Sequence, residues 1–200
     1  SISAAIKNAE IGSVIELWDD LYEENVVFDG SKGGRTSFTL QAAPGKKEIV
    51  WRSARNDPDT PLLRLIKTPG FKLKGAGIIL DGALDKNRNV NDLILVSLNC
   101  SGLLVDDLQL RHFARNGVLI MNAEGSAERP IRVEGLWTFT QQSEKPRGAI
   151  YFDANPKMTP ALNDHIRIGD CTFNGIDAKL AIQFSNKLDV LGDNVRWPGK

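Results

Sequence analysis

The chain has 200 residues, of which 42% are hydrophobic and 25% are charged, which is the composition of a globular protein and not of a disordered one. Its 25 basic residues balance its 25 acidic residues, which argues against a nucleic-acid-binding surface and against a polybasic membrane-binding surface. No apolar run approaches the about 20 residues of a membrane-spanning helix, so we expect no membrane segment in this chain.

The first twelve residues predict a short helix. Four apolar residues fall at i, i+3, i+4 and i+7 and therefore share one helical face: Ile2, Ala5, Ile6 and Ala9. Ser1 or Ser3 would serve as the N-cap, and Gly12 would end the helix. Alternation of apolar and polar residues, typical of strands, begins directly after this segment.

Five stretches of the chain share one pattern of eight residues. They are FKLKGAGI (71–78), LLVDDLQL (103–110), IRVEGLWT (131–138), IRIGDCTF (166–173) and LDVLGDNV (188–195). The first and third residues are apolar, which is the period of a strand with one buried face. The apolar spacing then lengthens by one residue, so the chain must bend. Gly and Asp tolerate the positive φ angle of such a corner, and the fifth residues are Gly75, Asp107, Gly135, Asp170 and Gly192.

A second class of strand lies between these units. Its members are LLRLI (62–66), LILVSL (93–98), GVLIM (117–121), GAIYF (148–152) and LAIQF (180–184). Unequal spacing of the units excludes a helical solenoid of fixed period and indicates parallel strands stacked in rungs around interior columns of side chains. Asn99, Asn122 and Asn186 follow three of these strands and would form an asparagine stack at a turn.

A solenoid of this kind has open ends, and the open N-terminal end needs a cap. We therefore expect an all-β parallel β-helix in a single domain over residues 1–200, with a helical cap at 1–12 and rungs at 13–200. The sheet edge at the C-terminal end would remain available for self-association.

The residues that open the chain match three segments, S-I-x-A-A-I, G-D-T-I-x-L and G-x-Y-x-E-x-V-x-I. The matching residues are Ser1, Ile2, Ala4, Ala5, Ile6, Gly12, Ile15, Leu17, Tyr22, Glu24, Val26 and Phe28. On these residues the chain resembles the right-handed parallel β-helix, or pectin-lyase-like, superfamily. It departs at Ser13–Val14, where Asp–Thr is usual, and at Asp20, where Gly is usual. The resemblance implies a right-handed β-helix for nearly the whole chain.

The same opening is similar to β-helix regions that follow the membrane segment in some bacterial Ser/Thr protein kinases. This resemblance implies an extracytoplasmic piece, periplasmic or at the cell surface, of a larger membrane-anchored kinase. The chain does not begin with Met and has no signal peptide, which agrees with a piece of a longer protein. It carries no Gly-rich kinase loop, HRD-type loop or DFG motif, so we expect no kinase activity in it.

The chain also offers no residues spaced for a metal or a cofactor. Cys100 and Cys171 are its only cysteines, and we expect both to be free thiols. His112 and His165 are its only histidines and lack the spacing of metal ligands. We therefore expect neither a metal site nor a cofactor.

A polysaccharide lyase or glycoside hydrolase is the alternative function that the fold implies. Glycoside hydrolysis needs two carboxylates across the scissile bond, and Asp106 and Asp107, near Arg111 and His112, are the one tempting pair. Asp107 already occupies a corner position, and adjacent strand residues point to opposite faces. The N-T-D, G-D-D, G-H-G and R-I-K motifs of polygalacturonase-type enzymes are absent. We therefore expect no catalytic residue.

Three aromatic residues are the candidate ligand-binding residues. In the strand at 131–139 the alternation sends Trp137 and Phe139 outward, and Tyr151 lies between two inward residues. Exposed aromatic surface usually has a partner, and a sugar ring stacks well on it, so we expect a glycan or cell-wall polysaccharide as ligand. The alternatives are that a loop (143–148 or 153–164) covers these side chains, or that the protein is a structural spacer.

Overall fold

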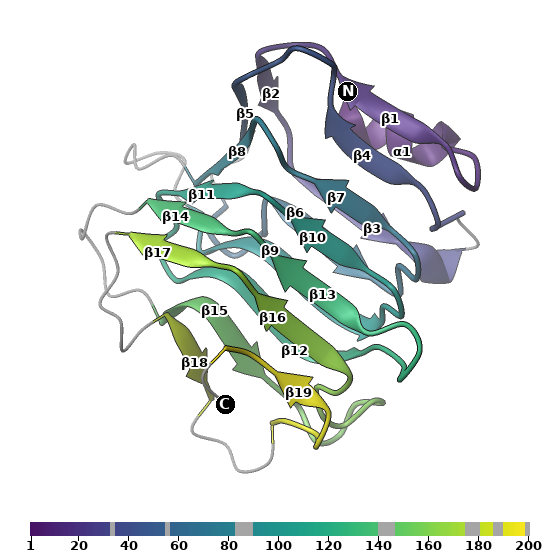
Figure 1. Ribbon diagram of the computed structural model, residues 1–200, viewed down its shortest axis with the longest axis vertical. Coiled ribbons are helices and arrows are strands. Elements are labelled where there is room, and N and C mark those ends of the chain that lie inside the picture. The colour runs from purple at the N-terminus through teal and green to yellow at the C-terminus, as the bar shows by residue number, and fades with distance from the viewer. Residues whose placement is uncertain are drawn as a thin grey trace.

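Alternating apolar residues drive the chain into three parallel sheets that share one interior. The computed structural model describes residues 1–32, 35–54, 57–82, 90–139, 147–174, 181–185 and 190–198. In this part of the chain the architecture is a right-handed parallel β-helix with one N-terminal α-helix, as predicted (Figure 1). The chain passes from sheet A to sheet B to sheet C, then returns to sheet A one rung further on, so each strand pairs with strands three positions away.

Sheet A has seven strands, and sheets B and C have six each. Sheet A contains β1 (Val14–Leu17), β4 (Thr39–Ala42), β7 (Lys72–Lys74), β10 (Leu104–Asp106), β13 (Ile131–Glu134), β16 (Ile166–Gly169) and β19 (Val195–Arg196). Sheet B contains β2 (Leu21–Glu23), β5 (Ile49–Arg52), β8 (Ile78–Asp81), β11 (Gln109–Arg111), β14 (Trp137–Phe139) and β17 (Thr172–Asn174). Sheet C contains β3 (Val26–Asp29), β6 (Leu63–Ile66), β9 (Asp92–Asn99), β12 (Asn116–Glu124), β15 (Gly148–Asp153) and β18 (Ile182–Phe184).

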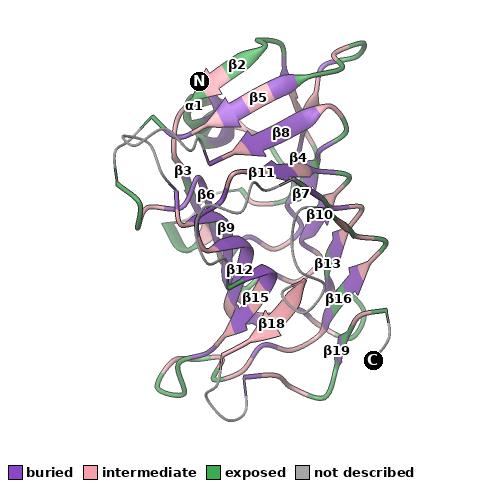
Figure 2. Ribbon diagram, turned by 90° about the vertical axis from the view of Figure 1, so that its left-hand side faces the viewer, coloured by how far each residue is buried: buried purple, intermediate pink, exposed green. Residues whose placement is uncertain are grey.

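Side chains at equivalent positions form continuous columns in the interior. One column of sheet A, read through the strand registers, is Ile15, Leu40, Leu73, Val105, Val133 and Ile168. The four middle members of this column are fully buried. Buried positions recur along the strands of all three sheets (Figure 2). Burial of such columns supplies the main driving force for a fold in which each rung contacts only its neighbours.

The predicted corners are confirmed at three of the five units. Asp107, Gly135 and Asp170 have φ angles of 51°, 63° and 47°, and each stands between a strand of sheet A and a strand of sheet B. In the unit at 71–78 the positive φ belongs to Gly77 and not to Gly75. This corner is two residues longer than the corner of the next unit, because Leu73 pairs with Val105 whereas Ile79 pairs with Gln109. Ile78 therefore occupies the sixth position of the pattern, which was predicted for Ala76.

The register predicted for the last unit, 188–195, is wrong. Val195 pairs with Ile166, so Val195 opens the final strand of sheet A and Gly192 is not a corner. Val190 and Val195 are both apolar residues that could lie in a strand of sheet A. Only the pairing with β16 shows that Val195, and not Val190, belongs to that strand. The residues 186–189, including Leu188 of the predicted unit, lie outside the described part of the chain.

The second class of predicted strand forms sheet C. The described strands overlap all five predicted stretches, although only part of the stretch at 180–184 is described. The predicted asparagine stack is wrong, because Asn99 pairs with Glu124 and not with Asn122. The register shifts between Met121 and Ala123, which moves Asn122 out of line. Asn186 lies outside the described residues.

The N-terminal helix α1 (Ile2–Asn8) packs against the first rung. Ile2 and Ile6 are buried in the common core, and Ser1 Oγ accepts a hydrogen bond from the Ala4 amide at 3.2 Å, as expected of an N-cap. The Glu24 carboxylate accepts from the amide of Ile2 and from the hydroxyl of Ser3 at 2.8 Å. The helix is shorter than the predicted 1–12, because the chain leaves the helical conformation at Ala9.

Aromatic rings gather near both ends of the interior. Phe28, Phe38 and Phe71 contact one another with ring centroids 5.2–5.4 Å apart. Near the other end, Phe184 stacks on Phe152 at 5.8 Å and contacts Trp197 at 5.3 Å. Among the described residues, no helix has both the length and the apolar character needed to cross a membrane.

Candidate functional site

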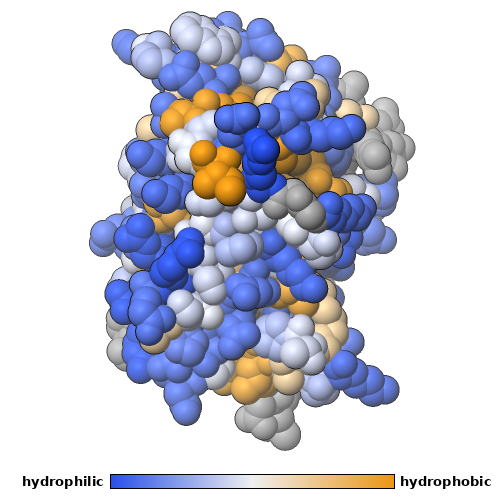
Figure 3. All heavy atoms as spheres, turned by 90° about the vertical axis from the view of Figure 1, so that its right-hand side faces the viewer, coloured by the Kyte–Doolittle hydropathy of each residue, from blue (hydrophilic) through white to orange (hydrophobic). Residues whose placement is uncertain are grey.

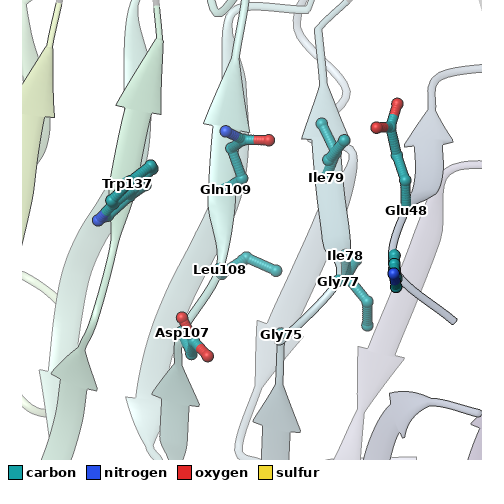
Figure 4. Close-up of a pocket in the computed structure, with 10 residues that line it drawn as sticks. Glu48, Gly75, Gly77, Ile78, Ile79, Asp107, Leu108, Gln109 and Trp137 are labelled. Carbon is teal, nitrogen blue, oxygen red and sulfur yellow. The ribbon is translucent and has the colours of Figure 1, made fainter. Parts of the chain in front are cut away.

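A groove of about 170 Å³ crosses the corner between sheets A and B. Residues from four successive rungs line it: Lys47 and Glu48 before β5, Gly75 and Gly77–Ile79 at the β7–β8 corner, Asp107–Gln109 at the β10–β11 corner, and Trp137 on β14. Figure 4 shows Trp137, Gln109, Ile79 and Glu48 in a row across these rungs, with Asp107 and Gly75 below them at the corner. We call this feature the corner groove.

Two glycines allow neighbouring rungs to pack closely beneath the corner groove. A Cβ atom on Gly75 would lie 2.5 Å from Leu108 Cδ1, and a Cβ on Gly77 would lie 2.9 Å from the carbonyl oxygen of Lys46. Gly77 also has a φ angle of 79°, which residues with a Cβ rarely adopt. Ile78 and Ile79 are only 1% and 4% exposed, so the floor is apolar and firmly packed.

Trp137 is the exposed aromatic wall of the groove. Its side chain is 54% exposed, whereas its neighbours Leu136 and Thr138 are fully buried. This is the alternation that the sequence predicts, and it directs the indole away from the core. An exposed indole next to a groove provides a flat apolar surface with one N–H donor at its edge.

Gln109 supplies an oriented amide beside the indole. Its register partners are Trp137 on one side and Ile79 on the other, so the three side chains leave the same face of sheet B. Gln109 Oε1 accepts a hydrogen bond from Arg111 Nη2 at 2.7 Å, which holds the amide in place. Figure 4 shows the amide nitrogen turned toward Trp137, where it would donate to a ligand resting on the ring.

Charged side chains complete the rim of the groove. Asp107, Glu48 and Lys47 are all exposed, and no hydrogen bond or ion pair ties Glu48 or Lys47 to another side chain in the described residues. Carboxylates accept hydrogen bonds from hydroxyl groups, and an ammonium group donates to hydroxyl oxygens. The groove therefore combines an apolar platform with donors and acceptors, which is the combination that binds a polyhydroxylated ring.

The three predicted site residues do not form one cluster. Trp137 and Phe139 belong to the same strand of sheet B, whereas Tyr151 belongs to sheet C, on another side of the solenoid. The side chain of Phe139 lies outside the described part of the structure. Tyr151 is half-buried on the outer face of sheet C, and the guanidinium of Arg147 lies 5.8 Å from its ring centroid.

The acidic pair considered for catalysis is split by the corner. Asp106 ends strand β10 opposite Lys74 and Glu134, and Asp107 turns the chain with its positive φ angle. His112 Nδ1 lies 2.8 Å from Asp81 Oδ1, which is the geometry of a base with an orienting carboxylate. Yet no hydroxyl or thiol among the described residues hydrogen-bonds this imidazole, so the described residues place no nucleophile beside it.

The residues with metal-binding chemistry are dispersed. Within the described ranges, no three of the His, Cys, Asp and Glu side chains are placed to hold one ion. Cys100 and Cys171 are both free thiols, as the sequence predicts, and burial raises the pKa of each. Both thiols are therefore protonated at neutral pH and are poor nucleophiles.

Gln109, Glu48 and Asp107 are groove residues that the sequence did not single out for binding. Gln109 stands 28 positions before Trp137 in the sequence, and only the strand register places them side by side. The eight-residue pattern could have revealed that Gln109 and Trp137 are neighbours. When LLVDDLQL is aligned with IRVEGLWT, both residues fall at the seventh position. Glu48 belongs to no repeated unit and carries no such signal.

Comparisons with known proteins identify no relative of this chain. No protein-family model matches the chain, and searches among curated proteins and among solved structures returned no match either.

Proposed function

We propose that this protein is a non-catalytic recognition domain that binds a carbohydrate chain in the corner groove. The observation that carries the proposal is the 54% exposed indole of Trp137, held beside the oriented amide of Gln109 over a packed apolar floor. An exposed aromatic surface of this kind usually marks a binding site, and flanking polar groups provide specificity.

The size of the groove favours a polymer over a small free ligand. Pockets that enclose small molecules measure about 300–1,000 Å³. The corner groove, at about 170 Å³, is smaller and open. A groove of that size accommodates one part of a longer ligand, for example one sugar of a polysaccharide lying along the surface.

The wider biological setting belongs to the same proposal. The stacked parallel sheets agree with the resemblance to the pectin-lyase-like superfamily, and that resemblance supports a carbohydrate as the class of ligand. The similarity of the opening residues to β-helix regions of bacterial Ser/Thr kinases supports an extracytoplasmic sensor role. In that setting glycan binding would be the signal that the larger protein detects.

A glycan array with the wild type and two tryptophan variants tests the proposal. Trp137→Ala should weaken binding to the preferred glycan by roughly 5- to 30-fold, the equivalent of about 1–2 kcal/mol for a lost stacking contact. Trp18→Ala is the matched control, because Trp18 is 61% exposed and lies outside the groove. Equal losses in both variants would contradict the groove as the site.

Two other results would replace the proposal with one of its alternatives. Release of reducing ends or unsaturated products from a polyuronide by the wild-type protein would establish a carbohydrate-active enzyme. Absence of binding to every glycan on the array would favour a structural spacer.

A further inference from the structure

A second pocket lies where the turns enter sheet A near the C-terminal end, and we call it the arginine pocket. It measures about 210 Å³, and its polar lining consists of Ser126, His165, Arg167, Asn194 and Arg196. No lining residue is acidic. Hydrophilic side chains cover most of this side of the molecule (Figure 3). In a chain whose basic and acidic residues balance, such a pocket is a local concentration of positive charge.

The strand register explains why the arginines gather here. Arg132 pairs with Arg167, and Arg167 pairs with Arg196, so three guanidinium groups leave the outer face of sheet A on successive strands. Neighbouring strands lie about 4.8 Å apart. Like charges directly opposite one another in a sheet are destabilising, so this column would be more favourable with an anion between its members.

Acidic neighbours do not neutralise the last two arginines. Arg132 has a carboxylate nearby, with Glu134 Oε1 at 3.8 Å. The register partner of Glu134 on the next strand is Gly169, so the acidic position is lost there. Arg167 is exposed and makes no hydrogen bond or ion pair with any described residue. Arg196 donates through Nη1 to the carbonyl oxygens of Asp193 and Val195, which orients its guanidinium group and leaves Nε and Nη2 to other partners.

The carboxylate of Asp164, beside the lining residue His165, is already occupied. Asp164 Oδ1 accepts from the amides of His165 at 2.9 Å and Asn194 at 3.0 Å, and Oδ2 accepts from Asn194 Nδ2 at 3.3 Å. His165 itself adopts a φ angle of 51°, in the left-handed region that His, Asn and Asp enter more often than other residues with a Cβ. Its Nδ1 atom is buried and makes no hydrogen bond among the described residues, although it lies 3.4 Å from Asp164 Oδ2.

From this arrangement we propose that the arginine pocket binds a single phosphate or sulfate group. Guanidinium forks bind such oxyanions through paired N–H donors, and two forks from adjacent strands would grip one group from two sides. Ser126 contributes a hydroxyl whose oxygen accepts from the Arg129 amide, so its proton remains to be donated. The group is either a free anion or an ester on a larger molecule, and both share this chemistry. The site lies on sheet A and does not depend on the corner groove.

Calorimetric titration with inorganic phosphate and with inorganic sulfate, in a low-chloride buffer, tests the proposal. We expect saturable binding of one equivalent of at least one of the two anions. Arg167→Ala and Arg196→Ala should each weaken it at least ten-fold, and Arg167→Lys should weaken it less than Arg167→Ala does. Arg64→Ala, an exposed arginine of sheet C, should leave the affinity unchanged. Thermal unfolding of each variant shows whether it is folded.

Titration with dextran sulfate and uncharged dextran distinguishes the sources of the anion. Tighter binding of dextran sulfate than of inorganic sulfate, lost in Arg167→Ala, supports the site with a polymer-borne ester as ligand. Equal affinity per sulfate group supports the site with a free anion as ligand. The proposal is overturned if neither inorganic anion saturates the wild-type protein, or if Arg64→Ala weakens binding as much as Arg167→Ala. Trp137→Ala should not change anion binding, because Trp137 lies in the corner groove. The anion titration therefore tests the arginine pocket independently of glycan binding in the corner groove.

Discussion

Asn122 and Asn155, which are 33 residues apart in the sequence, hold each other by two hydrogen bonds. The Asn155 amide donates to Asn122 Oδ1 at 2.9 Å, and Asn122 Nδ2 donates to the carbonyl oxygen of Asn155 at 3.0 Å. The same Nδ2 also donates to the carbonyl oxygens of Pro160 and Ala161. One fully buried side chain at the end of β12 therefore organises the long turn that follows β15.

Replacing Asn122 by Ala should lower the free energy of unfolding by about 3 kcal/mol. The substitution removes four part-buried hydrogen bonds between Asn122 and the backbone of the turn, and each typical hydrogen bond contributes about 0.5–1.5 kcal/mol. It also removes a residue type that tolerates the φ angle of 51° observed at this position. Chemical denaturation measures the change, and hydrogen exchange should show faster exchange of the amides between 153 and 164.

Asn99→Ala is the matched control for that experiment. Asn99 ends strand β9 of sheet C, but it is exposed, and among the described residues its Oδ1 accepts only from the amide and hydroxyl of Ser101. We expect its loss to change stability by no more than about 0.5 kcal/mol, as for other surface substitutions. A similar effect of both substitutions would show that Asn122 does not hold the turn.

Asp107 should tolerate Gly but not Val. With a φ angle of 51°, the corner suits Gly, whereas a β-branched residue in this region costs at least about 1–2 kcal/mol. Denaturation curves of Asp107→Gly and Asp107→Val test this, with Asp106→Val as control, since Asp106 occupies a strand position that suits Val. Comparable destabilisation by Gly and Val at position 107 would mean that the carboxylate itself, and not the backbone angle, is needed there.

The thiol of Cys171 should be unreactive at neutral pH and should affect stability only in alkali. Burial raises its pKa from 9.0 to about 11. The folded protein therefore keeps this proton where the unfolded chain releases it. The resulting stabilisation is complete below about pH 9 and is lost as the pH rises toward 11.

Two measurements on Cys171 check these expectations. Alkylation at pH 8 should be roughly 100-fold slower than for a thiol of ordinary pKa, because the thiolate fraction falls tenfold per pKa unit. Stability measured between pH 8 and pH 11 should decline more steeply in the wild type than in Cys171→Ala. The other titrating groups are common to both proteins, so parallel curves would refute the contribution of Cys171.

The candidate site was predictable only in part. Alternation along a strand places Trp137 outward, because this depends on neighbouring residues alone. The same reasoning treated Tyr151 as part of one aromatic set, although it lies on a different sheet. The arginine pocket also escaped prediction, since it depends on the pairing of Arg167 with Arg196, which directly follows the unit (188–195) whose register the sequence pattern placed wrongly.

The sequence by itself determined the strands other than the last one of sheet A, the helix at the N-terminus and the corners at Asp107, Gly135 and Asp170. These features follow from side-chain periodicity and from the φ angles that each residue type tolerates, which act over a few residues. The tertiary structure alone decided which residues of successive rungs became neighbours, as with Gln109 and Trp137 or Asn122 and Asn155. Those contacts depend on loop lengths and strand register, which are set when whole rungs pack against one another.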